Sequence, residues 1–164
     1  MKSMAIAFTG PSNSGKTTLI EKIAKKLIKN HQVAIIKNDP KDKAIFDVEG
    51  KDSYKFSQTG AETVVVSPAR TTYFSQRSKS LEEIVSMIKD FDYLLVEGLK
   101  TLPLPRVAIF REKIDESYFP YIKAIAIDES VDTSLYQIPE DIKILNLNNT
   151  DEIIKWIEQN ATKI

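Results

Sequence analysis

The chain has 164 residues, a length that suits one domain with a core able to fold without disulfides or a metal. Lys plus Arg and Asp plus Glu each number 23, so the formal net charge is zero and no overall positive field draws the protein to nucleic acid or to an anionic membrane. The absence of cysteine excludes a disulfide framework, a thiolate nucleophile and a Cys-ligated metal site. No apolar run approaches the roughly 20 residues of a membrane-spanning helix, and we expect a cytoplasmic protein.

Short apolar runs alternate with helical patterns along the chain. Most of the runs are continuously apolar, which is typical of strands buried on both faces in a parallel sheet covered by helices. This alternation predicts the α/β class, with a mostly parallel twisted sheet flanked by helices, in a single domain over residues 1–164. The predicted strands are Met4–Phe8, Val33–Ile36, Thr63–Val66, Tyr93–Val96, Val107–Phe110, Ala124–Ile127 and Lys143–Leu145.

Four amphipathic patterns predict helices. The first ends near Asn30, and the second, Asp52–Thr59, is expected to stop at Gly60, a residue that tolerates positive φ. The third is Ser80–Lys89 and the last is Thr150–Asn160. The residues expected to face the core are Leu19, Ile20, Ile23, Ala24, Leu27 and Ile28 in the first helix, Leu81, Ile84, Val85 and Ile88 in the third, and Ile153, Ile154, Trp156 and Ile157 in the last.

Three segments do not fit this alternation. Residues 38–50 are polar and are expected to form a loop, and residues 100–105 carry two prolines and are expected to connect two strands. Residues 67–79 are compatible with either a strand pair or a mobile loop.

The segment GPSNSGKT between the first strand and the first helix carries a phosphate-binding motif. Gly10, Gly15, Lys16 and Thr17 match the pattern G-x-x-x-x-G-K-[ST], in which glycines let successive backbone N–H groups point at one anion. Lys16 is expected to reach the β and γ phosphates, and Thr17 to offer its hydroxyl to Mg²⁺. The motif and its context predict a three-layer fold of the P-loop NTPase type. The expected phosphate-cradle residues are Gly10, Pro11, Ser12, Asn13, Ser14, Gly15, Lys16, Thr17 and Thr18.

Two acidic residues follow predicted strands directly. Glu97 comes after four apolar residues and is expected, with Thr17, at the Mg²⁺; the alternative is an exposed loop acid. Asp39 follows the second strand and is expected near Mg²⁺ or the attacking water; the alternative is a residue that caps a loop. Lys16, Asp39 and Glu97 are the candidate catalytic residues.

Basic side chains elsewhere have two readings each. Arg70, Arg77 and Lys79 either contact an anionic ligand or a partner protein, or form the solvated face of a hairpin. Arg111 ends a strand and either binds phosphate or pairs with Glu112 or another acid.

Aromatic residues give weaker signals. Tyr54 and Phe56 face either a ligand or dimer partner, or the core, which is the favoured reading. His31 is expected to be a helix-end residue, because a lone His is a poor metal site. The chain has no N-K-x-D loop for guanine, and the segment Asn146–Asp151 resembles one only superficially.

Four segments together, GPSNSGKTTL, DVEGKDSYKFSQTGA, DYLLVEGLK and PRVAIFR, resemble the MobB family, the molybdopterin-guanine dinucleotide biosynthesis adapter proteins. The resemblance implies a homodimer that binds GTP with Mg²⁺, hydrolyses it weakly, and assists a MobA-like enzyme that attaches GMP to molybdopterin. It also implies that Lys51, Asp52 and Ser53 lie near the site and that Lys100 follows the acidic strand end. Residues 107–110 and 67–79 are the expected dimer contacts.

One departure from the family pattern concerns the second strand. Family members often carry histidine just after it, whereas this chain has Lys37-Asn38-Asp39-Pro40, so any role of a histidine there is in doubt. Two other functions remain open. One is a small-molecule kinase or ATP-dependent ligase on a similar fold, with residues 70–79 as its lid. The other is an interaction module in which the nucleotide is structural.

Overall fold

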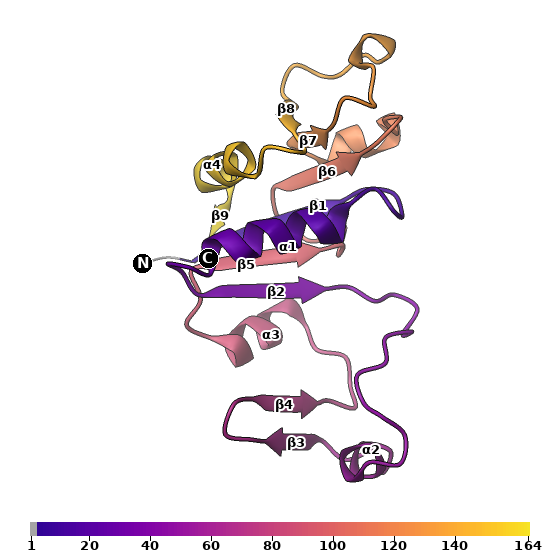
Figure 1. Cartoon of the computed structure of the whole chain (residues 1–164), viewed down its shortest axis with the longest axis vertical. Coiled ribbons are helices and arrows are strands. Elements are labelled where there is room, and N and C mark those ends of the chain that lie inside the picture. The colour runs from indigo at the N-terminus through magenta and orange to yellow at the C-terminus, as the bar shows by residue number, and fades with distance from the viewer. Residues whose placement is uncertain (1–2) are drawn as a thin grey trace. The chain divides into compact units, whose positions relative to one another are not determined.

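The computed structural model describes residues 3–164 (Figure 1). Within them, no helix is long and apolar enough to cross a membrane. The strands are β1 (Met4–Thr9), β2 (Val33–Lys37), β3 (Thr63–Val66), β4 (Thr71–Phe74), β5 (Tyr93–Glu97), β6 (Arg106–Phe110), β7 (Ala124–Ile127), β8 (Lys143–Asn146) and β9 (Thr162–Lys163). The α-helices are α1 (Lys16–Leu27), α2 (Asp52–Ser57), α3 (Leu81–Ile88) and α4 (Thr150–Asn160), and the 3-10 helices are η1 (Glu116–Tyr121) and η2 (Thr133–Leu135).

The chain divides into two compact units. The larger unit combines the residues before Asp39 with residues 90–164, and the smaller one is 39–89. The assignment of the whole chain to one nucleotide-binding domain stays a prediction.

The larger unit is built on one mostly parallel sheet. Its strand order is β2-β5-β1-β6-β7-β8, with all these neighbours parallel, and the short β9 adds an antiparallel pairing to β1. The predicted fold class is confirmed. In the register of this sheet, Phe8 lies opposite Glu97, which brings the ends of β1 and β5 to one edge.

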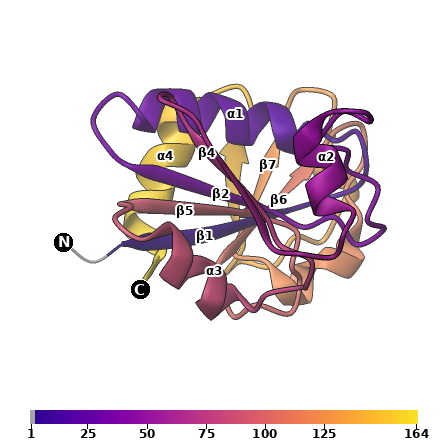
Figure 2. The ribbon, with the colours of Figure 1, turned by 90° about the horizontal axis from the view of Figure 1, so that it is seen from below.

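Apolar side chains cover both faces of this sheet. On one face, Phe8 and Ile109 pack with Leu19 and Ile23 of α1 and with Ile153 of α4. Figure 2 shows α1 and α4 on the same side of the sheet. The other face packs against η1 and its flanks, as the buried residues Ala108, Phe110, Ile114, Ile122 and Ile125 show. Successive side chains along each strand point to opposite faces of the sheet, and both faces are covered. Residues on both faces of the central strands are therefore buried, which explains why the strand sequences are continuously apolar.

Helix α1 confirms its predicted apolar stripe with one exception. Leu19, Ile20, Ile23 and Leu27 are buried, whereas Ile28 is 56% exposed. Ile28 is the C-cap residue, so it lies beyond the last turn that packs on the sheet.

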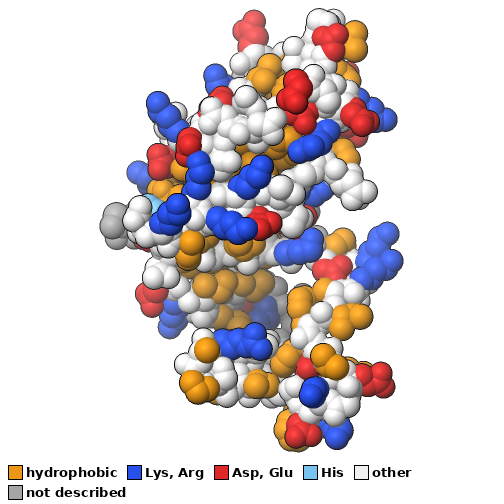
Figure 3. All heavy atoms as spheres, in the orientation of Figure 1, with side chains coloured by type: hydrophobic (Ala, Val, Ile, Leu, Met, Phe, Trp, Pro, Cys, Tyr) orange, Lys and Arg blue, Asp and Glu red, His pale blue; other side chains and the backbone are white. Residues whose placement is uncertain are grey.

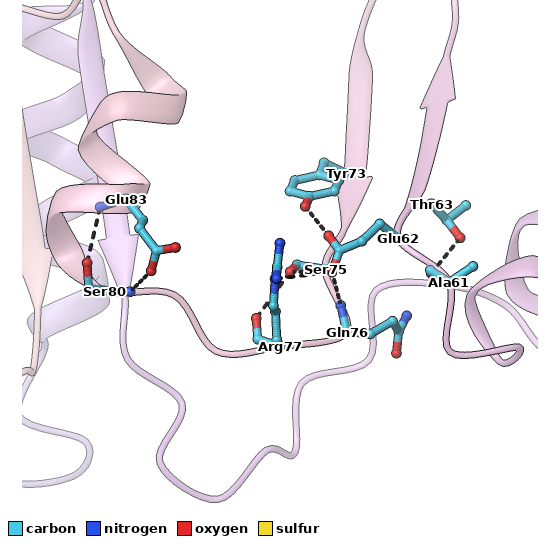
Figure 4. Close-up of polar contacts among 9 residues, drawn as sticks. All are labelled: Ala61, Glu62, Thr63, Tyr73, Ser75, Gln76, Arg77, Ser80 and Glu83. Carbon is cyan, nitrogen blue, oxygen red and sulfur yellow. Dashed lines mark hydrogen bonds and ion pairs between the residues drawn. The ribbon is translucent and has the colours of Figure 1, made fainter.

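The smaller unit contains an antiparallel hairpin formed by β3 and β4. The open question about residues 67–79 is therefore answered by a strand pair, of which Thr71–Phe74 is the second strand. Glu62 ties the base of the hairpin together, because its carboxylate accepts hydrogen bonds from Tyr73, from Ser75 and from the backbone of Gln76 (Figure 4).

Two expectations about buried apolar residues in this unit hold only in part. In α3, Leu81, Ile84 and Val85 are half-buried, whereas Ile88 is 43% exposed. In α2, Tyr54 is half-buried, whereas Phe56 is 60% exposed, so the core position expected for Phe56 is wrong. Short helices and a two-stranded sheet offer too little surface to bury a full apolar stripe. Orange side chains are visible over the hairpin in Figure 3, where Val64 and Val66 are 55% and 75% exposed.

Strand β6 contradicts the dimer contact expected at residues 107–110. Val107 to Phe110 are fully buried, and the strand pairs with β1 on one side and β7 on the other. A central strand has no free edge or face to offer a second chain, so this expectation is wrong.

Candidate functional site

The phosphate motif lies in the larger unit, between the end of β1 and the start of α1. β1 ends at Thr9, the loop runs from Gly10 to Gly15, and α1 begins at Lys16. The loop thus occupies the carboxyl edge of the sheet and leads into a helix N-terminus, the two features that favour anion binding in this kind of fold.

The loop takes backbone conformations that favour glycine. Gly10 has φ +138° and Gly15 has φ +99°, and between them Asn13 has φ +62°. A Cβ atom at Gly10 would lie 2.5 Å from the backbone oxygen of Ile109, closer than real contacts allow. Gly10 is therefore required both by its conformation and by the close approach of β6.

Lys16 folds back over this loop. Its Nζ donates to the carbonyl oxygen of Gly10 at 3.0 Å and to that of Pro11 at 2.5 Å. Burial is the largest influence on its pKa, which is lowered; the charge of Glu97 opposes this, and the charges of Lys37 and Lys100 add to it. The ammonium group is thus held by two carbonyls at the place where an anion would take over these contacts.

Thr17 and Glu97 line the same pocket. This pocket has a volume of about 470 Å³ and also includes Ser12, Asn13, Gly15, Lys16 and Thr18. The side chain of Glu97 is 14% exposed, and its Oε2 accepts from Lys37 Nζ at 2.8 Å. The predicted pairing of a hydroxyl with a strand-end carboxylate is therefore present in one pocket.

The donor set of this pocket fits Mg²⁺ better than a metal held by protein alone. Among residues 3–164, no group of three or more His, Cys, Asp or Glu side chains is placed to hold a metal. Mg²⁺ typically takes one or two protein oxygens, substrate phosphates and several waters. The hydroxyl of Thr17 and the carboxylate of Glu97 match that requirement, provided that Lys37 releases Glu97.

Ser14 is a buried polar residue of the loop whose hydroxyl lacks a hydrogen-bond partner among the described residues. It is 6% exposed, and its Oγ is buried without a hydrogen-bond partner in the described chain. A buried hydroxyl without a partner costs about 1–3 kcal/mol, a cost that is tolerated mainly at functional sites.

Asp39 belongs to the smaller unit. Its Oδ2 accepts from the backbone N–H groups of Lys43 at 2.8 Å and Ala44 at 2.7 Å. These bonds are the loop-capping arrangement, and the role of Asp39 near Mg²⁺ or water stays a prediction. The same holds for the residues at the start of α2, where Ser53 Oγ donates to Asp47 at 3.1 Å.

Arg111 pairs with an acid that the sequence did not single out. Its Nε lies 3.6 Å from Oδ2 of Asp128, at the end of β7, and Glu112 is not its partner. The guanidinium also borders the phosphate loop, because a Cβ at Gly15 would lie 3.4 Å from the same Nε. Hydrogen bonds from Ser130 are the main reason that the pKa of Asp128 is lowered, and the charge of Arg111 adds to them.

The basic residues of the hairpin contact neighbours within their own unit. Arg77 Nε lies 3.7 Å from Glu62 Oε1, and Lys79 Nζ lies 5.6 Å from the ring centre of Tyr73. These contacts match the solvated hairpin face rather than a free anion site. His31, as expected, follows the first helix: its backbone N–H donates to Leu27.

Sequence reasoning missed Arg106 as a residue of interest. It is the first residue of β6 and only 2% exposed, and it donates to the carbonyl oxygens of Gly98, Leu99 and Leu102 at 2.8, 3.0 and 3.2 Å. Burial lowers its pKa. The sequence feature that indicates its burial is its position directly before the apolar residues 107–110, which places the charged side chain inside the fold.

Known proteins share both the sequence and the fold. Residues 5–128 match the family described as molybdopterin guanine dinucleotide synthesis protein B, MobB. A Methanocaldococcus jannaschii protein, provisionally assigned as a molybdopterin-guanine dinucleotide biosynthesis adapter protein, is 33% identical over 155 residues, which are 87% of this chain and 64% of that protein. This chain therefore spans just under two thirds of that relative.

Two further proteins match over most of their length. The molybdopterin-guanine dinucleotide biosynthesis adapter protein of Haemophilus influenzae is 29% identical over 166 residues, covering 93% of this chain and 86% of its own. The crystal structure of Bacillus subtilis MobB superposes with a TM-score of 0.75 at 24% identity, covering 96% of this chain and 98% of that one, which shows a shared fold.

Proposed function

We propose, from the premise that this chain belongs to the MobB family, that it is a GTP-binding adapter in the biosynthesis of molybdopterin guanine dinucleotide. The observation that carries the proposal is the single pocket that joins Lys16, Thr17 and Glu97 at the phosphate loop. Membership of a family does not by itself show that the phosphate loop is intact. In this chain the lysine, the hydroxyl and the carboxylate that binding of phosphate and Mg²⁺ needs are all present in the pocket.

Binding of the triphosphate follows from the loop. Its backbone N–H groups and the start of α1 attract the phosphates, and Lys16 exchanges its bonds to Gly10 and Pro11 for phosphate oxygens. Thr17 and Glu97 are the residues that would hold Mg²⁺. When bound, Mg²⁺ supplies charge neutralisation of the phosphates.

Hydrolysis in this site is expected to be slow. The residues lining the pocket include neither an arginine finger nor a glutamine that orients water. Asp39 is proposed as the residue near the attacking water, so removal of Asp39 should lower hydrolysis more than binding. A weak GTPase activity fits an adapter whose nucleotide state acts as a switch.

Selection of guanine is assigned to the adjoining ends of β7 and β8. A pocket of about 350 Å³ there is lined by Asp128, Glu129 and Asn146, among others. Both carboxylate oxygens of Asp128 have partners, Ser130 and Arg111. Glu129, whose Oε2 accepts one long bond from Asn148 Nδ2 at 3.4 Å, is the acid proposed to accept the N1–H and N2–H groups of guanine. Adenine presents no such pair of donors, so this acid would favour GTP.

The proposed partners follow from the relatives. The partner enzyme is a MobA-like protein that transfers GMP to molybdopterin, and the setting is cytoplasmic. A second copy of the chain is the proposed homodimer partner, for which the exposed β3–β4 hairpin offers the apolar residues Val64 and Val66. The kinase or ligase alternative is not favoured, because residues 5–128 match the MobB family.

Calorimetry on the variant Lys16→Ala tests the proposal. Loss of charge-assisted bonds to two phosphates is expected to weaken Mg²⁺–GTP binding roughly 10- to 100-fold. Lys29→Ala, which removes an exposed lysine beyond the end of the same helix, should bind as the parent does. If Lys16→Ala bound GTP as tightly as the parent, the proposed site would be wrong.

A further inference from the structure

A second pocket lies beside the phosphate loop, on the face of the sheet that packs against η1. Its volume is about 610 Å³, and its walls include Thr9, Lys100, Arg106, Ser117, Tyr118 and Tyr121. Thr9 directly precedes Gly10 of the phosphate loop, and the charge of Lys100 is felt by Lys16. The pocket therefore adjoins the nucleotide site without sharing its lining residues.

The pocket is lined by two cations and by no acidic residue. Arg106 is 2% exposed, and the three hydrogen bonds found for it all end on backbone carbonyls, so two of its five N–H groups remain. Lys100 has an acid in its neighbourhood outside the lining: hydrogen bonds from Ser117 lower the pKa of Asp115, and the charge of Lys100 adds to them. A buried cation such as Arg106 is normally paired, and none of the lining residues is acidic.

The side chain of Thr9 also lines the pocket. Thr9 is 4% exposed, and its hydroxyl is not among the fully buried polar atoms that lack a partner. No hydrogen bond is found for this hydroxyl within the described chain, so a ligand atom in the pocket would bond it at the cost of no existing bond. Thr9 and Arg106 thus offer a hydroxyl and N–H groups to a ligand from two different strands.

Aromatic rings form the rest of the wall. The ring of Tyr118 is fixed by an edge-to-face contact with Phe110, with centroids 5.5 Å apart at 83°. Lys100 Nζ lies 4.8 Å from the centre of the Tyr118 ring. Tyr121 is 68% exposed, so its ring is available to a ligand. Rigid rings beside cations suit a planar ligand that carries negative charge.

From these observations we propose that this pocket binds an anionic, planar heteroaromatic compound, and that its ligand is the pterin whose nucleotide conjugate the family makes. The choice of a pterin rests on the proposed function, whereas the charge and shape of the ligand rest on the pocket. The adapter would then hold the pterin next to the nucleotide, with Lys100 and Arg106 facing its anionic groups and Tyr118 and Tyr121 facing its ring.

The test uses pterin-6-carboxylate, a fluorescent anionic pterin, titrated into the full chain. Lys100→Gln and Tyr121→Ala should each weaken binding about tenfold, since one charge-assisted contact or one ring contact is worth about that much. Lys113→Gln removes a cation outside the pocket and should leave binding unchanged. Inorganic phosphate at the same concentration should not displace the probe.

Several outcomes would overturn the inference. They are no saturable binding, equal loss with Lys113→Gln, or full displacement by inorganic phosphate, which would leave an anion site without recognition of the ring. Mg²⁺–GTP binding is measured on the same samples. A chain that binds GTP but not the probe contradicts this inference alone, and a chain that binds the probe but not GTP contradicts the proposed function alone.

Discussion

Gly10 offers a quantitative test of why the phosphate loop has its shape. In Gly10→Ala, the new Cβ would meet the Ile109 backbone oxygen at 2.5 Å, and the residue would have to keep φ +138°. The unfavourable φ costs about 1–2 kcal/mol, and forcing apart a packed backbone contact costs about 1–3 kcal/mol more. The sum is a large part of the roughly 5–15 kcal/mol that stabilises a typical domain.

Gly15→Ala is the matched control within the same loop. Gly15 also has positive φ, but a Cβ there would lie 3.4 Å from the end of the Arg111 side chain, which is ordinary contact. Only the conformational cost of about 1–2 kcal/mol should therefore appear. Urea unfolding of both variants measures the difference, which we expect to be about 1–3 kcal/mol. Equal stability of the two variants would refute the role assigned to the close approach of β6.

Three further changes have defined outcomes. Glu97→Gln should raise the Mg²⁺ concentration needed for GTP binding about tenfold, measured by titration, because the pocket loses its carboxylate; an unchanged requirement would exclude Glu97 from the metal. Burial lowers the pKa of Lys16 and a bound triphosphate should raise it, so affinity should be full below the pKa of the free protein and fall as pH rises through it. Calorimetry in two buffers of different ionisation enthalpy should show that GTP binding takes up a proton at pH values above the pKa of Lys16 in the free protein. The absence of proton uptake there would contradict a contact between Lys16 and the triphosphate. Ser80→Ala should destabilise α3 by about 1 kcal/mol, seen as faster amide exchange there, because the capping box with Glu83 is lost (Figure 4); unchanged exchange would count against it.

Much of the fold was predictable because its signals are local. The continuous apolar runs predicted every strand of the main sheet except β9, whose two residues are too short to show a pattern. The glycine and lysine pattern predicted the strand, loop and helix of the phosphate site. Such predictions succeed because backbone conformation and burial at these positions are determined by the residues themselves.

What escaped prediction depends on contacts distant in sequence. The place of Arg106 before an apolar strand indicated burial but not its partners, the carbonyls of residues 98–102, since only the folded connection between β5 and β6 brings them together. The pairing of Arg111 with Asp128 was also not predicted. It arises because β6 and β7 are parallel neighbours, so that the residues following the two strands lie side by side. Phe56 was expected in a core because hydrophobicity alone does not say whether an element has a surface to pack against.

The measurement that tests the central claim most directly is calorimetry of GTP and ATP binding in the presence of Mg²⁺, with the parent chain and Glu129→Gln. The account predicts that the parent prefers GTP and that Glu129→Gln loses this preference, because the amide cannot accept both guanine donors. A parent chain that bound ATP as well as GTP, or better, would contradict the account.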